Sequence, residues 1–101
     1  MMDEIEWLQT WYQNCCDGRW EHEYGIKIGT LDNPGWRIRI DLAGTPVEGR
    51  AMEPIEADRS DTDWLFCKIE EGAFVGHGDP TKLTKMIAIF REWVSRSDSG
   101  R

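Results

Sequence analysis

The fold is decided by residues 24–42, whose sequence is YGIKIGTLDNPGWRIRIDL. Apolar residues alternate with other residues on both sides of residues 32–35, which is the period of a strand with one buried face. Proline followed by glycine fits a type II turn, because proline presets φ and glycine tolerates the positive φ that follows. The sequence therefore predicts a β-hairpin covered on one face only, with Lys27, Arg37 and Arg39 on the wet face.

Apolar periodicity predicts a helix near each end of the chain. The first spans residues 3–16, and the second begins at Asp79-Pro80, a typical helix start, and runs to about residue 95. Because the hairpin has one apolar face, both helices are expected on the same side of the sheet, with Trp36 and Phe90 largely buried. The core-facing stripe predicted for the first helix, flanked by Trp7 and Trp11, consists of Ile5, Leu8, Tyr12 and Cys15.

Shorter segments between the hairpin and the second helix complete the sheet. Residues 64–69 are apolar on both faces, which suggests a strand near the sheet centre, and residues 73–76 suggest a short final strand. Residues 50–57 are an edge strand or a bulge, because Pro54 cannot donate to a ladder, and residues 58–61 are expected to turn. The sequence predicts an α+β fold: a meander-like antiparallel sheet of four to five strands flanked on one face by N-terminal and C-terminal helices.

The chain has the length and composition of one compact domain. It has 101 residues, of which 40% are hydrophobic and six are Trp, enough to build a core without a metal or a disulfide. We expect a single domain over residues 1–96 and a flexible tail over residues 97–101. Cys15, Cys16 and Cys67 are odd in number, and the N-terminus does not resemble a signal peptide, so reduced thiols in a cytoplasm are expected.

The charge of the chain is strongly acidic. A net charge of -7 disfavours direct contact with nucleic acid or anionic membranes and favours a basic protein partner, although solubility alone also requires net charge. The last helix is basic, whereas residues 53–71 carry seven carboxylates against Arg59 and Lys68. A dipolar surface of this kind suits docking to a positively charged groove, and an ordinary solvated face would look the same. The seven carboxylates are Glu53, Glu56, Asp58, Asp61, Asp63, Glu70 and Glu71.

No motif with catalytic specificity is present in the sequence. His22 lies between Glu21 and Glu23, and a carboxylate beside a histidine favours acid–base chemistry. Neighbours on an extended chain point to opposite faces, however, so a connection anchored by Trp20 is the simpler interpretation. We assign no catalytic residue, metal or cofactor, because nothing in the spacing of the possible ligands indicates a metal site. Those ligands are Cys15, Cys67, His22 and His77.

Several short motifs together suggest a family. They are Trp7-Leu8-Gln9, Trp11-Tyr12, Cys16-Asp17-Gly18, Trp20-Glu21-His22, Tyr24-Gly25-Ile26-Lys27-Ile28, Thr30-Leu31-Asp32-Asn33-Pro34-Gly35-Trp36, Ile40-Asp41-Leu42, Arg59-Ser60, Asp63-Trp64 and Ile89-Phe90-Arg91-Glu92-Trp93. Over residues 4–95 the chain resembles the immunity protein 53 family of bacterial polymorphic-toxin systems. The resemblance implies a cytoplasmic antidote that binds a cognate toxin domain and blocks it.

The main hypothesis is therefore that an acidic surface occludes the active or substrate site of a toxin. A nuclease is one such toxin, because it needs a basic groove for its substrate. The alternatives are a small enzyme or ligand-binding module that uses residues 21–23, and a cytoplasmic adaptor unrelated to toxins. The residues predicted to bind the partner are Trp20, Glu21, His22, Glu23, Glu53, Glu56, Asp58, Asp61 and Asp63.

Overall fold

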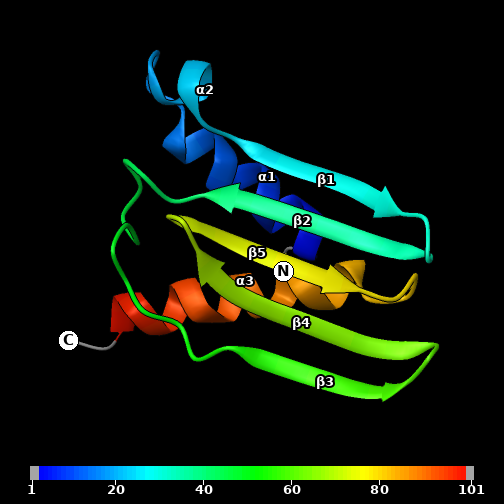
Figure 1. The fold of residues 1–101 in the computed structure, drawn as a ribbon. Helices are drawn as coiled ribbons and strands as arrows, with labels where there is room; N and C mark the ends of the chain where they lie inside the picture. Colours follow the sequence, from blue (N-terminus) through cyan, green and yellow to red (C-terminus); the bar gives the residue numbers. More distant parts are fainter. Residues whose placement is uncertain (1–2, 100–101) are drawn as a thin grey trace.

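A computed structural model describes residues 3–99 (Figure 1). The elements are α1 (Glu4–Cys15), α2 (Trp20–Glu23), β1 (Ile26–Leu31), β2 (Gly35–Asp41), β3 (Ile55–Ser60), β4 (Asp63–Glu70), β5 (Ala73–Gly78) and α3 (Leu83–Ser99). The two long helices lie on one face of a five-stranded antiparallel sheet, so the predicted α+β architecture is confirmed (Figure 1). Since α3 continues through Ser99, residues 97–99 of the expected tail are helical, and residues 100–101 lie outside the described part. Among residues 3–99, neither long helix combines the length and the apolar character that a bilayer span requires.

The strands lie in the order β1-β2-β5-β4-β3, and every neighbouring pair is antiparallel. After β2 the chain crosses to the far edge, returns as the meander β3-β4-β5, and places β5 beside β2 (Figure 1). The central strand is therefore β5, and all its residues except His77 are buried. Residues 64–69, which were expected near the centre, belong to β4, the next strand.

The segment 50–57 contains the start of the second edge strand. Pro54 precedes β3, which forms one edge of the sheet and so agrees with the expected edge position. The turn predicted at residues 58–61 starts later than expected, because β3 continues to Ser60 and only residues 61–62 form the turn. Polar residues can extend a strand here because an edge strand is largely exposed to solvent.

β1 and β2 form the predicted hairpin, but its turn differs from the prediction. The type II turn is wrong, because Gly35 does not have a positive φ, and the peptide bond between Asn33 and Pro34 is cis. Gly35 instead allows a close approach of two strands. A Cβ atom at this position would overlap the carbonyl oxygen of Gly78 and would lie 3.2 Å from the ring of Trp64.

The close approach at Gly35 predicts that alanine substitution at two glycines of the hairpin, Gly35 and Gly29, changes the free energy of unfolding by different amounts. Gly35→Ala is expected to lower the free energy of unfolding by about 1–3 kcal/mol, because the added methyl group meets backbone that cannot move freely. Gly29→Ala is the matched control, since a Cβ there has no neighbour within 4 Å. Its free energy of unfolding should stay unchanged or rise by at most about 1 kcal/mol. Urea denaturation measures both, and equal losses would contradict the prediction.

The buried face of α1 differs from the predicted stripe. Asp3 caps the helix in a capping box, and the residues that the helix buries are Leu8 and Trp11. Ile5 is 48% exposed and Tyr12 is 38% exposed, so their assignment to the core is wrong. The helix turns Trp11 toward the sheet because the larger indole buries more apolar area than either of them.

α3 begins later than predicted, because Leu83 rather than residue 79 starts the helix. Asp79 is instead fully buried in the turn before it. Its carboxylate accepts hydrogen bonds from Lys82 Nζ at 2.7 Å and from the backbone N–H groups of Thr81 at 2.8 Å and Trp64 at 2.9 Å. These donors, Lys82 foremost, lower the pKa of Asp79. Asp79 thus ties the end of β5 to β4 and to the start of α3.

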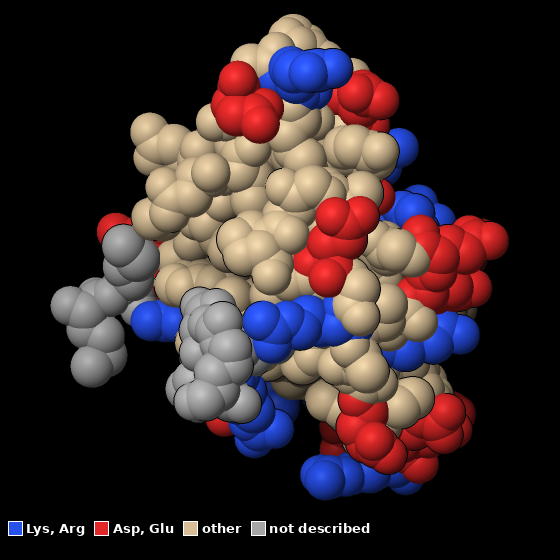
Figure 2. Space-filling view, turned by 90° about the vertical axis from the view of Figure 1, so that its left-hand side faces the viewer, with Lys and Arg blue, Asp and Glu red and all other residues tan. Residues whose placement is uncertain are grey.

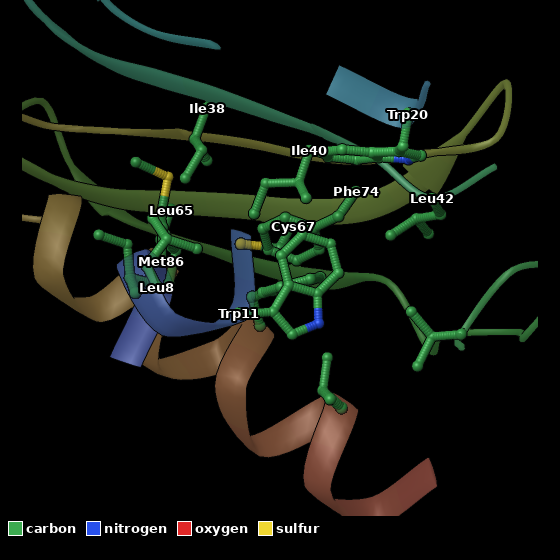
Figure 3. Close-up of a cluster of buried hydrophobic side chains, with 14 residues drawn as sticks. Leu8, Trp11, Trp20, Ile38, Ile40, Leu42, Leu65, Cys67, Phe74 and Met86 are labelled. Carbon is green, nitrogen blue, oxygen red and sulfur yellow. The ribbon is translucent and has the colours of Figure 1, made fainter. Parts of the chain in front are cut away.

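The core fills the space between the sheet and the two long helices. Phe90 of α3 is fully buried, as expected, and its ring lies 5.0 Å from the rings of both Trp11 and Phe74 between centroids. As the sequence predicted, Arg37 is exposed, and the side chain of Arg39 is partly exposed. Trp36, which was expected to be largely buried, is only half-buried. Figure 3 shows side chains from the sheet and from the helices converging on this space. The residues labelled there are Leu8, Trp11, Trp20, Ile38, Ile40, Leu42, Leu65, Cys67, Phe74 and Met86.

The crossover loop, residues 42–54, is compact although it contains neither strand nor helix. Backbone hydrogen bonds between residues three apart fold its first half into successive turns. Two indoles hold its ends: Trp20 Nε1 donates to the carbonyl of Ala43 at 2.8 Å, and Trp93 Nε1 donates to the carbonyl of Ala51 at 3.0 Å. The core therefore fixes the path by which the chain reaches the far edge.

Candidate partner-binding surfaces

The residues predicted to bind a partner fall into two groups near opposite edges of the sheet. The α2 group consists of Trp20, Glu21, His22 and Glu23, which form α2 near the start of β1 (Figure 1). The β3 acidic group consists of Glu53, Glu56, Asp58, Asp61 and Asp63, which lie in or next to β3. Four strand spacings, roughly 19 Å, separate the two edges. A single short segment of a partner cannot cover both groups.

The segment before β1 folds into a tight turn and one helical turn, so the extended chain expected there is wrong. Asp17 Oδ1 accepts hydrogen bonds from the backbone N–H groups of Trp20 and Arg19, each at 2.9 Å, and these bonds lower the pKa of Asp17. The carboxylate of Glu21 turns back and accepts from the N–H groups of Asp17 and Gly18 at 3.0 and 2.9 Å. Glu21 is therefore engaged in holding its own turn.

Trp20 belongs to the core rather than to the surface of the α2 group. Its side chain is 5% exposed and packs edge-on against Trp11, with ring centroids 6.3 Å apart. The ring of Tyr12 also lies edge-on to it at 5.8 Å. Trp20 thus positions α2, while His22 and Glu23 are the exposed members of the group.

The side chains considered for catalysis or metal binding do not converge. His22 is exposed on α2, whereas His77 lies on the sheet face that points away from the helices. Cys67 lies on the opposite face, in the core, and burial raises its pKa to about 12. Burial likewise raises the pKa of Cys15 to about 11. Among the side chains that the structure describes, those of residues 3–96, no cluster of three or more His, Cys, Asp or Glu is placed to hold a metal ion.

The β3 acidic group presents most of its charge to solvent. Asp63 forms an ion pair with Lys82, whose Nζ lies 2.9 Å from Asp63 Oδ1. The other four members are exposed and form no ion pair with any residue that the structure describes: Glu53, Glu56, Asp58 and Asp61. No cation among the described residues pairs with these four carboxylates, so they give this edge of the sheet a negative potential.

The uncovered face of the sheet carries both signs of charge. The strand register places Glu56, Phe66, His77 and Arg37 in one row across the four strands β3, β4, β5 and β2. Desolvation and then the positive charge of Arg37 lower the pKa of His77. Figure 2 views the molecule from the left side of Figure 1 and shows acidic and basic side chains interspersed over that side. On that side of the molecule the acidic side chains therefore do not form one continuous field.

A groove that the sequence analysis missed lies between α1, α2 and the edge strand β1. Its volume is about 660 Å³, and its walls include His22 and Glu23. It is lined by the four large hydrophobic side chains that are exposed among residues 3–99: Ile5, Tyr12, Tyr24 and Ile28. Single exposed hydrophobic residues are ordinary, but a contiguous group marks a binding surface. The sequence gives no distinct signal for the groove, because Ile5 and Tyr12 follow the same apolar period as the buried residues of the first helix.

Comparison with known proteins gives one match. A family model described as Immunity protein 53 matches residues 5–95, which include both groups and the groove. No curated protein and no solved structure matches the chain. The match extends over about nine tenths of the 101 residues and agrees with the resemblance seen in the motifs. The chain therefore belongs to the immunity protein 53 family.

Proposed function

We propose that this protein binds a cognate bacterial toxin domain and neutralises it by covering the active or substrate-binding site. Membership of the immunity protein 53 family supports this proposal most strongly. Inhibition by binding needs a complementary surface and no catalytic group. The scattered positions of His22, His77 and the cysteines suit such a protein.

The β3 acidic group is proposed as the surface that meets the substrate site. Its four exposed carboxylates lie along one edge of the sheet and its flanking turns. A nuclease toxin must hold phosphates with lysine and arginine, so carboxylates can occupy the same positions and block the substrate. The net charge of -7 speeds the encounter with a basic toxin of this class.

The proposed place of action is the cytoplasm. Cys15, Cys16 and Cys67 are free thiols, which are the usual state of cysteine in a reducing compartment. A toxin directed at nucleic acid acts in the same compartment, so the antidote would meet it there.

Co-expression tests the proposed function directly. Cells that produce the toxin domain encoded beside this gene are expected to grow only when this protein is present. In a separate binding assay, a toxin domain with its active site inactivated should bind the purified protein. Equal killing with and without this protein would overturn the proposal.

Neutralising two carboxylates of the β3 acidic group is expected to slow association with the toxin. The double variant Glu56→Gln, Asp58→Asn should lower the association rate several-fold at low salt, because the charge attraction is long-ranged. The difference should vanish near 1 M salt, where charges are screened within about 3 Å. Stopped-flow fluorescence measures the rates. Glu92→Gln, an exposed carboxylate on α3, is the control, and an equal effect of this variant would show that position does not matter.

A further inference from the structure

The outer edge of β1 presents unpaired backbone groups. The carbonyl of Gly25 accepts a hydrogen bond from the N–H of Asp41 at 3.1 Å, and hydrogen-bonded pairs alternate along an antiparallel ladder. In the register of β1 and β2, the N–H and C=O groups of Ile26, Ile28 and Thr30 therefore point away from β2. Among residues 3–99, no helix or strand lies beside this edge except α2 at its start (Figure 1).

The two edges of the sheet differ in how they discourage a further strand. At β3, Pro54 precedes the strand, the register shifts between Asp58 and Ser60, and two carboxylates, of Glu56 and Asp58, line the edge. Proline, irregular register and charge are the features by which proteins protect an edge. β1 contains no proline, pairs with β2 in an unbroken register, and carries a single charged residue, Lys27. Only β1 is left able to accept another strand.

The open edge of β1 and the apolar groove are adjacent. Ile26 and Ile28, whose backbone groups point outward, also line the groove with their side chains. A strand added beside β1 would lie about 4.8 Å from it, with alternate side chains on the helix side of the sheet. Those side chains would reach the groove and contact Ile5, Tyr12 and Tyr24. Backbone pairing and apolar burial are thus available to the same incoming segment.

The charge around the groove favours a basic occupant over a second copy of this chain. Residues 3–31 carry six carboxylates and two basic side chains. In the groove wall, the two carboxylates of Glu23 and Asp41 outnumber the one ammonium group of Lys27. A second copy has the same acidic segment and the same net charge of -7, so pairing of two copies brings like charges together. An extended segment with basic side chains meets opposite charge instead.

We propose that an extended segment of the toxin domain, with alternating apolar and basic side chains, adds to β1 as a sixth strand and fills the groove. This inference rests on the proposed function and names how the partner is held. Backbone hydrogen bonds to an edge strand give affinity, and pockets for alternate side chains give specificity. The β3 acidic group attracts the toxin from a distance, whereas the groove holds the bound complex.

Hydrogen exchange tests the added strand at single amides. The probe is the toxin domain encoded beside this gene, with its active site inactivated. The amides of Ile28 and Thr30 should exchange rapidly in the free protein and at least about tenfold more slowly in the complex. The amides of Lys27 and Gly29 already bond to β2 in the free protein and serve as the internal control. Unchanged exchange at Ile28 and Thr30 in a formed complex would overturn the inference.

Two variants test the same contact by affinity. Thr30→Pro removes an outward N–H without breaking the β1–β2 ladder, and Ile28→Ala trims an exposed side chain that the fold does not need. Each should raise the Kd for the inactive toxin domain at least about tenfold. Thr30→Ala is the matched control, because it changes the same residue and keeps the outward backbone N–H. It should change the Kd by less than about threefold.

The outcomes separate this inference from the proposed function. If the wild-type protein binds and protects, but Thr30→Pro and Ile28→Ala bind equally well, strand addition is wrong and the proposed function stands. If the wild-type protein neither binds nor protects, both are wrong. If the free protein sediments as a dimer that Thr30→Pro converts to a monomer, the occupant is a second copy and the inference is overturned. A Kd raised as much by Thr30→Ala as by Thr30→Pro would show that the backbone N–H of Thr30 does not hold the partner and would overturn it too.

Discussion

Replacing Phe90 by alanine is expected to lower the free energy of unfolding by about 3–5 kcal/mol. Phe90 is fully buried, and its ring meets those of Trp7, Trp11, Phe74 and Trp93 at centroid distances of 5.0 to 6.0 Å. Removing the ring takes apolar surface out of the core and leaves a cavity that rigid neighbouring rings cannot fill. Since a domain of this size is stable by only about 5–15 kcal/mol, the variant should be close to unfolding.

Urea denaturation followed by tryptophan fluorescence measures this loss against two controls. Phe90→Leu keeps much of the volume and should cost less than Phe90→Ala, about 1.5 kcal/mol or less. Tyr24→Ala removes a ring that is 39% exposed and should cost well under half as much as Phe90→Ala. Equal losses for Phe90→Ala and Tyr24→Ala would show that Phe90 is not the centre of the core.

The second large effect is expected at Asp79, where Asp79→Asn should lower the melting temperature at pH 7 by about 10 °C. The buried carboxylate accepts four hydrogen bonds, from Trp64 N, Thr81 N, Thr81 Oγ1 and Lys82 Nζ. Asparagine has one acceptor oxygen, and its NH2 group would face donors that then lack a partner. The junction of β4, β5 and α3 would lose its common acceptor.

The effect at Asp79 should depend on pH in a defined direction. Its pKa is lowered in the folded protein, first by Lys82 and then by Thr81. Such a carboxyl stabilises the fold above its unfolded pKa, near about 4, and the contribution is lost as the pH falls further. The difference in melting temperature between wild type and Asp79→Asn should therefore be constant from about pH 5 to 7 and shrink below about pH 4.

The control for Asp79 is the other carboxylate that contacts Lys82. Asp63→Asn removes a more exposed partner and should change the melting temperature by less than about 4 °C at pH 7. Differential scanning fluorimetry across the pH range records all three proteins. A difference between wild type and Asp79→Asn that persists unchanged to about pH 2 would contradict the role given to the ionised carboxyl.

The sequence predicted those parts of the fold that depend on local pattern. The hairpin of β1 and β2 follows from alternation around a turn, and the helices follow from their apolar period. The central position of β5 does not follow from local pattern, because a short segment that contains Gly76 and Gly78 has a composition that disfavours a strand. In the structure these glycines make room for Met86 and Lys82, which pack over the strand. Only tertiary packing makes this segment the centre of the sheet.

The candidate surfaces were predictable to a lesser degree. The carboxylates of the β3 acidic group could be named because charged residues in an edge strand and its turns stay at the surface. The groove could not, because Ile5, Tyr12 and Ile28 satisfy the same periodicity as buried residues. Periodicity tells which face of an element is apolar, but it does not tell how far the opposite layer extends over that face. Trp20 shows the reverse case: it was expected at a contact and lies in the core.

The two indoles that hold the crossover loop also affect how readily proteases cleave the native protein. A protease cuts a folded protein where a stretch of chain can open locally. The loop that contains Arg50 is fastened at Ala43 by Trp20 and at Ala51 by Trp93, so it cannot open without disturbing the core. We therefore expect that trypsin does not cleave the native protein in this loop, although the loop is the longest irregular segment between two strands.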